Sequence, residues 1–184
     1  SYVLYGSSTG LGSAAALPTT TPRDICIGDV DGDGDDDIVF PSYQSGGSDY
    51  VQDGYVYENY RGNFSSARVD LIEANGSTDC HIRDLDADGY EDILFGSHIQ
   101  SSRYAQPIIH WGDASASWAS NDWGSPWNGG RQTTVYDVDQ DGNLDIIHPA
   151  SYDGDYSGTN SVIYWGPNFF NSRDFMVDAG AWEI

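Results

Sequence analysis

Residues 29–40 read DVDGDGDDDIVF. This stretch carries six aspartates in nine residues and then becomes apolar, as a short β-strand does. Carboxylates at this density repel one another, so either a cation neutralises them or the segment stays loose in water. The stretch therefore predicts a cation-binding loop in front of a strand, or else a solvated acidic turn.

The acidic pattern occurs three times. It returns as DLDADGYEDILF from Asp84 and as DVDQDGNLDIIH from Asp137, at offsets of 55 and 53 residues. A second motif, an aromatic strand signal such as YVYEN or VIYWG, keeps the same period at Val3, Val56, Ile109 and Ile163. Because two unrelated motifs share one period, the chain is an internal repeat.

Each repeat consists of short strand signals and turns. In the first repeat, β-branched segments at 24–30 and 36–40 flank the acidic loop. A Gly/Ser/Tyr-rich connector at 42–53, an aromatic strand at 55–60 and a more variable strand at 67–74 follow. There is no convincing amphipathic helix. Four short antiparallel strands per unit of about 50 residues predict an all-β fold made of β-propeller blades.

Counting strands divides this single repeat domain, residues 1–184, into unequal parts. Residues 1–22 form a half blade with only the third and fourth strands, and three blades follow at 23–75, 78–130 and 131–184. Propellers have roughly 4–8 blades, so this partial propeller does not close a ring by itself. Since open blade edges favour aggregation, we expect the remainder of a longer chain, or other copies of this one, to complete the assembly.

The three loops share the pattern D-x-D-x-D-G-x-x-D. Carboxylates at positions 1, 3, 5 and 9 converge when the loop curls at its glycine. The residues concerned are Asp29, Asp31, Asp33 and Asp37, then Asp84, Asp86, Asp88 and Asp92, and finally Asp137, Asp139, Asp141 and Asp145. Position 7 can add a carbonyl oxygen from Asp35, Tyr90 and Asn143. This all-oxygen set suits Ca²⁺, which takes about six to eight ligands, better than Mg²⁺. The sequence thus predicts three Ca²⁺ sites.

The loops differ from EF-hands. An EF-hand needs a bidentate Glu at position 12 between two helices, whereas position 12 is Phe40, Phe95 or His148 inside a strand signal. The ninth-position Asp must therefore close the cage. Three loops in register, each followed by a strand, favour metal binding over the solvated turn.

These loops, with the repeated YWG strand and the D-I-(V/L/I)-F strand, resemble the FG-GAP/VCBS repeats of integrin-like β-propellers. The resemblance covers essentially the whole chain. It implies that each loop joins the first two strands of a blade and holds calcium with the twelve aspartates named above. The chain departs from the integrin pattern because GAP is replaced by residues 41–43, 96–98 and 149–151, which read PSY, GSH and PAS. We expect an extracellular or cell-surface module with a structural, adhesion or recognition role.

Composition excludes several partners. The formal net charge is −22, with 29 acidic residues, seven arginines and no lysine. Such a surface repels nucleic acid and anionic membranes, and a lysine Schiff base is impossible. No apolar run reaches the ~18 residues of a membrane-spanning helix, so no membrane insertion is expected. Sequons occur at Asn63 and Asn75, but so short a motif is weak support for glycosylation.

Aromatic side chains provide the candidate ligand sites. Trp118, Trp123 and Trp127 occur in one repeat only, where they can stack on sugar rings or cover an outer strand. The connectors 42–53, 97–106 and 150–160 carry tyrosines, including Tyr43, Tyr104 and Tyr152. The family architecture implies that these connectors lie opposite the calcium loops, on the face expected to bind a glycan or protein. A lectin, or an ancillary domain of a secreted polysaccharide-active enzyme, is the alternative function.

Catalysis and cysteine chemistry are weakly signalled. No His/Cys group has zinc spacing, and no nucleophile–base pair can be argued, so we expect no enzyme activity. His148 is expected to be a packing residue in the slot of Phe40 and Phe95. Cys26 and Cys80 precede their loops on neighbouring inner strands, which permits a disulfide or two buried free thiols.

Overall fold

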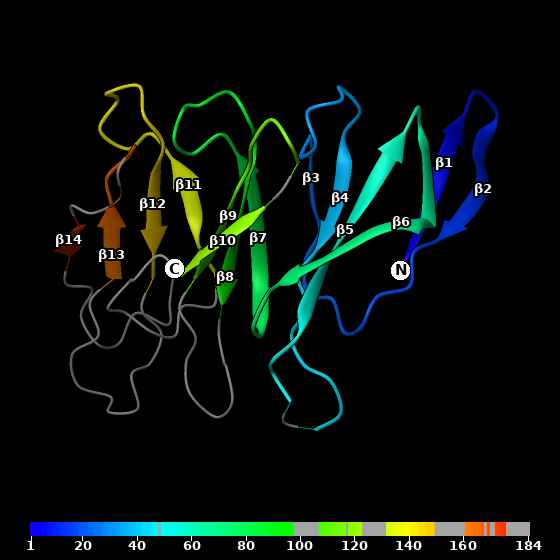
Figure 1. Cartoon of the computed structure of the whole chain (residues 1–184), viewed down its shortest axis with the longest axis horizontal. Helices are drawn as coiled ribbons and strands as arrows, with labels where there is room; N and C mark the ends of the chain where they lie inside the picture. The colour runs from blue at the N-terminus through cyan, green and yellow to red at the C-terminus, as the bar shows by residue number, and fades with distance from the viewer. Residues whose placement is uncertain are drawn as a thin grey trace.

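A computed structural model describes residues 1–47, 49–97, 107–116, 118–122, 132–149, 161–167, 169 and 172–175. Every secondary-structure element found in these ranges is a β-strand, so the predicted all-β architecture is confirmed there. The strands form one two-stranded and three four-stranded antiparallel sheets. The sheets stand side by side from the N-terminal hairpin at one end to the last sheet at the other (Figure 1). Among the described residues no helix is long and apolar enough to cross a membrane.

The two-stranded sheet is a hairpin at the N-terminus. Its strands β1 (Tyr2–Ser7) and β2 (Gly10–Ala16) pair antiparallel with an irregularity between Leu4 and Gly6. The residue after β2, Leu17, is fully buried against the next sheet in a cluster with Phe40 and Tyr57. The hairpin is therefore packed on the first four-stranded sheet and is not a free arm.

Each four-stranded sheet follows the chain from its first to its fourth strand. The first contains β3 (Cys26–Gly28), β4 (Asp37–Phe40), β5 (Asp53–Tyr60) and β6 (Asn63–Glu73). The second contains β7 (Ser77–Arg83), β8 (Asp92–Ser97), β9 (Ile108–Trp111) and β10 (Ala119–Asp122). The third contains β11 (Thr134–Tyr136), β12 (Asp145–His148), β13 (Ser161–Tyr164) and β14 (Ser172–Phe175). The same meander thus occurs three times.

The core lies in the seams between neighbouring sheets. On β8, Ile93 and Phe95 pack in the cluster shared with the first sheet, whereas Leu94 packs in the cluster shared with the third. Because successive side chains of a strand point to opposite faces, a central strand between two sheets must be apolar on both. This explains why segments such as DIVF lack the alternation of a half-exposed strand.

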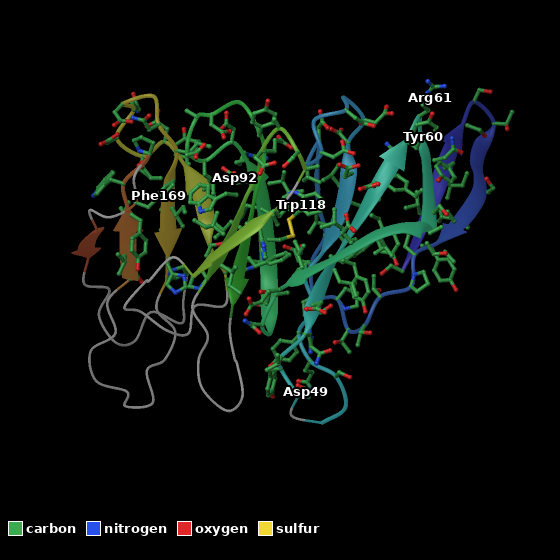
Figure 2. All side chains as sticks on the ribbon, viewed as in Figure 1. Asp49, Tyr60, Arg61, Asp92, Trp118 and Phe169 are labelled. Carbon is green, nitrogen blue, oxygen red and sulfur yellow. A yellow bond between two sulfur atoms is a disulfide. The ribbon has the colours of Figure 1, made fainter. Side chains whose placement is uncertain are left out.

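A disulfide crosses the first seam. Cys26 on β3 and Cys80 on β7 are bonded, with their Cα atoms 6.0 Å apart (Figure 2). The alternative of two free thiols is therefore wrong, because neighbouring inner strands lie within bridging distance. Disulfides persist mainly in oxidising compartments, so this bond fits a protein that is exposed outside the cytosol.

The second seam has a hydrogen bond where the first has the disulfide. The repeat offsets place Cys26 in register with His81 and Cys80 in register with Thr133. The His81 Nε2 lies 3.0 Å from the Thr133 carbonyl oxygen. Asp79 raises the pKa of His81 above its usual range chiefly through a side-chain hydrogen bond. One position of the repeat therefore links adjacent sheets by different chemistry.

A carboxylate links the sheets in both seams. Asp24 accepts a bond from the Cys80 backbone N–H at 3.2 Å. Its repeat equivalent, Asp79, accepts bonds from the Thr133 N–H and hydroxyl at 2.6 and 3.0 Å. These contacts repeat with the sequence period, so the sheets meet in the same way at each seam.

Candidate metal centres

The three acidic loops lie at one edge of the molecule. They join β3 to β4, β7 to β8 and β11 to β12, and all three project from the same side of the row of sheets (Figure 1). The connector between β4 and β5 projects from the opposite side (Figure 1). The fold therefore separates the acidic edge from the first tyrosine-bearing connector.

Backbone N–H groups hold the loop carboxylates in place. In every loop the first-position Asp accepts a bond from the glycine N–H at position 6, at 3.0 Å each time. The third-position carboxylate accepts from the N–H at position 5 at 3.0–3.2 Å. The fifth accepts from the N–H at position 7, the residue being Asp35, Tyr90 or Asn143. The three loops thus share one hydrogen-bonded shape.

That shape brings carboxylate oxygens together. In each loop three of them lie within 4.8 Å of one another, which is the spacing of ligands around one cation. The groups are Asp29, Asp31 and Asp33 in the first loop, Asp84, Asp86 and Asp92 in the second, and Asp137, Asp139 and Asp145 in the third. The remaining fifth- and ninth-position aspartates, Asp37, Asp88 and Asp141, belong to the same loops but lie outside these groups.

The ninth-position aspartates also brace the sheets. Asp37 is fully buried and accepts bonds from the N–H groups of Val30 at 3.1 Å and Asn59 at 2.8 Å. Asp92 is held in the same way by Leu85 and Gly112, both at 2.8 Å. Each carboxylate therefore joins its loop to the end of the third strand of the sheet. This structural role is separate from any part in binding a cation.

Burial makes these braces hard to ionise. Burial, opposed by the two backbone hydrogen bonds, raises the pKa of Asp37 to about 7. The same causes raise the pKa of Asp92 to about 6. A nearby divalent cation favours the charged form of a carboxylate and so opposes this cost.

Two positions of each loop adopt the left-handed backbone conformation. Gly34, Gly89 and Gly142 at position 6 have φ of +93°, +96° and +94°, as the glycine in the motif predicts. Position 4 has φ of +74°, +63° and +62° at Gly32, Ala87 and Gln140. The sequence gives no sign of the second position, since glycine occurs there only once.

One acidic residue near the first loop is missed by the loop pattern. Glu91 belongs to the second loop, but its side chain lies against the end of β3 next to the first loop. A Cβ added to Gly28 would lie 2.2 Å from the Glu91 Oε2. Burial raises the pKa of Glu91, while an Asp29 N–H bond and the charge of Arg83 lower it and the Asp29 charge raises it. The only sequence signal is Gly28 itself, because the equivalent residues are Arg83 and Tyr136.

The first loop contains an unsatisfied acceptor that a cation would satisfy. The Asp29 Oδ1 is buried and has no hydrogen-bond partner among the described residues. Burial, together with the charges of Asp33, Asp29 and Asp35, raises the pKa of Asp31. Buried lone pairs and converging like charges require a positive counterpart. The donor set is entirely oxygen, so the residues present fit a hard divalent ion.

The candidate ligand-binding aromatics are only partly described. Tyr43 is half-buried, lies under the Arg23 guanidinium at 4.7 Å and meets Tyr50 edge to face at 5.4 Å. Trp118 packs on the first seam, and its indole N–H lies 3.4 Å from the Val30 carbonyl oxygen. The other four, Tyr104, Trp123, Trp127 and Tyr152, lie outside the described residues.

Residues 29–95 match the family model of the FG-GAP-like repeat. The matched segment begins at the first aspartate of the first loop and ends on β8, just after the second loop. A comparison with curated proteins found no match. The chain is therefore identified as carrying an FG-GAP-like repeat over residues 29–95, which confirms for that segment the resemblance predicted from its sequence.

Proposed function

We propose that this chain is an extracellular, calcium-stabilised β-propeller repeat module with a structural, adhesion or recognition role. One observation supports it above all others: three equivalent loops each bring carboxylate oxygens of three aspartates within 4.8 Å. Three Ca²⁺ ions are held by the aspartates at positions 1, 3, 5 and 9 of each loop, with the carbonyl oxygen of position 7. The proposal contains no catalytic step.

Calcium acts architecturally in this proposal. Three divalent ions add six positive charges, which bring the formal net charge from −22 to −16. Each ion ties the turn between two strands, and ligands that converge only in the folded chain couple binding to folding. Stability therefore increases with the free calcium concentration.

Calorimetric titration with Ca²⁺ and thermal melting in calcium or chelator test the proposal. We expect three ions per chain and a melting temperature that falls by at least about 5 °C in chelator, as for the loss of some 2 kcal/mol. The matched control combines Asp31→Asn, Asp86→Asn and Asp139→Asn, which keep side-chain size and remove one charge per loop. A melting curve that is the same with and without chelator contradicts the proposal.

The disulfide favours an extracellular place for the module. Cytosolic disulfides are rare, whereas Cys26 and Cys80 are bonded across a seam of this chain. Secretion places the acidic loops in calcium concentrations that suit weak, solvent-exposed sites. Cell fractionation of the native source tests this part, since a cytosolic protein would contradict it.

The Tyr43 cluster favours a second candidate, carbohydrate recognition at the connector edge, in a lectin or in an ancillary domain of a polysaccharide-active enzyme. Tyr43 and Tyr50 lie on the connector between β4 and β5, opposite the acidic loops, and Arg23, from the segment before β3, lies over the Tyr43 ring. Aromatic faces with an arginine are typical of sugar-stacking sites. Glycan-array binding that Tyr43→Ala abolishes, and that Tyr60→Ala at the acidic edge leaves intact, supports this candidate. Absence of any glycan binding by the calcium-loaded chain counts against it.

A further inference from the structure

Glu91 connects the second acidic loop to the first. It occupies position 8 of the second loop, between Tyr90, which can offer its carbonyl oxygen, and Asp92, which belongs to the acidic group of that loop. Its carboxylate accepts a bond from the backbone N–H of Asp29, the first-position aspartate of the first loop. The main chain of Glu91 therefore belongs to one candidate site, while its side chain holds the main chain of another.

Both sides of Glu91 are closely packed. A Cβ added to Gly28, on β3 of the first sheet, would lie 2.2 Å from its Oε2 and 3.2 Å from its Cδ. A Cβ added to Gly112, just after β9 of the second sheet, would lie 2.3 Å from the Glu91 carbonyl oxygen. The two glycines leave the space that Glu91 fills, so Glu91 cannot shift without disturbing one sheet or the other.

Two further residues of the second repeat contact the first loop. The Tyr90 ring lies 3.9 Å from the place of a Cβ on Gly32, which is position 4 of the first loop. The Trp118 indole N–H lies 3.4 Å from the carbonyl oxygen of Val30, which is position 2. The first loop is therefore supported by the second repeat as well as by its own strands.

The first loop differs from the other two at the residue that Glu91 holds. In the second and third loops the Oδ1 of the first-position aspartate accepts a bond from the N–H of position 5, at 3.0 and 3.1 Å. The Oδ1 of Asp29 is buried and has no partner among the described residues. The ninth-position aspartate also belongs to the acidic group of the second and third loops but not of the first. The first site thus lacks two features of its equivalents and has the contact with Glu91 instead.

The second seam has no carboxylate at this position. The equivalent of Glu91 in the third loop is Leu144, which packs against the apolar cluster that contains Leu85. An apolar side chain accepts no hydrogen bond, so the third loop does not hold the main chain of the second in this way. The chain therefore contains its own comparison for the role of Glu91.

We propose that Glu91 is a positioning residue that couples calcium binding in the first loop to calcium binding in the second. Its main chain is fixed when Tyr90 and Asp92 bind an ion, and its carboxylate then fixes Asp29. Each binding event thus restricts motions that the other must also restrict, which gives positive cooperativity. This inference rests on the proposed function, because it takes the loops as calcium sites.

Variants with selected loops disabled measure the coupling by calorimetric Ca²⁺ titration. Asparagine at positions 3 and 5 removes two charges from a loop and keeps the oxygens that accept the N–H groups of positions 5 and 7. The three pairs are Asp31→Asn with Asp33→Asn, Asp86→Asn with Asp88→Asn, and Asp139→Asn with Asp141→Asn.

The coupling should be reciprocal and confined to one seam. With the third loop disabled throughout, disabling the second should weaken Ca²⁺ binding to the first by at least about fivefold. Disabling the first should weaken binding to the second by the same factor. The matched control has the first loop disabled throughout, and there disabling the third should leave the affinity of the second unchanged.

Two substitutions of Glu91 test the route of the coupling. Glu91→Leu copies Leu144 and removes the acceptor, so it should abolish the coupling in both directions. Glu91→Gln removes the charge but keeps an acceptor oxygen for the Asp29 N–H, so it should retain the coupling. In the metal-free chain the Asp29 amide hydrogen should exchange at least about tenfold faster in Glu91→Leu than in the wild type or in Glu91→Gln.

The outcomes separate this inference from the calcium proposal. Three ions that bind without coupling between the first two loops overturn the inference and leave the calcium proposal intact. Coupling that persists in Glu91→Leu, or that is lost in Glu91→Gln as well, also overturns the inference. If Glu91→Leu does not fold, the titrations of the disabled loops and of Glu91→Gln still decide. Absence of Ca²⁺ uptake by every loop contradicts the calcium proposal, and the coupling with it.

Discussion

At the scale of the residue, position 12 of the loop pattern, which lies on the second strand of each four-stranded sheet, shows how burial controls ionisation. Phe40, Phe95 and His148 occupy it in the three repeats, and all are buried. Neither ring nitrogen of His148 has a hydrogen-bond partner among the described residues. Burial lowers the pKa of His148 to about 4, although the charge of Asp79 opposes this. The folded chain therefore contains a neutral imidazole at the position where the other two repeats have phenyl rings.

Acid should destabilise the chain through His148. An unfolded histidine titrates near pH 6.5, so its contribution is constant above that pH and is lost as the pH falls from 6.5 towards 4. At pH 4.5 the loss is about 2–3 kcal/mol. Urea denaturation at pH 7 and pH 4.5 should show a smaller pH effect in His148→Phe than in the wild type. Carboxylates titrate in both proteins, so only the difference counts, and identical pH dependence contradicts the prediction.

Two aspartates of one loop should respond differently to the same change. Asp37→Asn replaces one of the two acceptor oxygens by an NH₂ group, so the buried N–H of either Val30 or Asn59 loses its acceptor. The change should lower the free energy of unfolding by about 2–4 kcal/mol even in chelator. Asp31→Asn keeps its acceptor for the Asp33 N–H and should weaken calcium binding, with a change of under about 0.5 kcal/mol in chelator. Denaturation in chelator and calorimetric Ca²⁺ titration measure the two effects. Equal losses of stability would show that the residues have the same role.

At the scale of the element, the inner strands are joined by side chains at one repeated position. The Cys26–Cys80 disulfide links β3 to β7, and the contact between His81 and Thr133 links β7 to β11. Because the first link is covalent and the second is not, the seams differ in how they respond to reduction.

Removing the disulfide should weaken the first seam. Closing a loop with a sequence separation of 54 restricts the unfolded chain, so Cys26→Ser with Cys80→Ser should lower the free energy of unfolding by about 2–4 kcal/mol. Urea denaturation of the wild type in reductant should reproduce this loss. Reductant should not affect the double variant, which is the control. An unchanged midpoint in the double variant refutes the contribution of the bond.

At the scale of the whole molecule, charge repulsion opposes folding. The formal net charge of −22 is spread over 184 residues, and the three densest acidic segments project from one edge (Figure 1). Repulsion at that edge is strongest when no cation occupies the loops. The compact chain is therefore expected to depend on counter-ions in general, and on calcium in particular.

Monovalent salt should consequently stabilise the metal-free chain more than the calcium-loaded chain. Raising KCl from about 0.05 to 0.5 M shortens the screening length by about threefold. We expect a larger increase in melting temperature in chelator than in millimolar calcium, measured by circular dichroism. An equal increase in both conditions would show that the loops are not the source of the repulsion.

Sequence reasoning reaches those features that are local and repeated. Asp29, Asp84 and Asp137 mark the loops because three equivalent patterns reinforce one another, and the strands after them follow from β-branched residues. It does not reach Glu91, whose contact with the first loop is made from another sheet. For the same reason the sequence does not decide between a Cys26–Cys80 disulfide and two free thiols, since spacing along the chain does not give the distance between inner strands.

The repeat of short antiparallel strands with acidic loops could be predicted from the sequence, because turn and strand preferences act over a few residues and recur in every unit. How the sheets meet could be seen in the tertiary structure only: the Cys26–Cys80 bond and the close approach of Glu91 to Gly28 are its examples. Those features depend on which side chains face one another across a seam. Sheet packing sets that distance and burial, and no single segment encodes them.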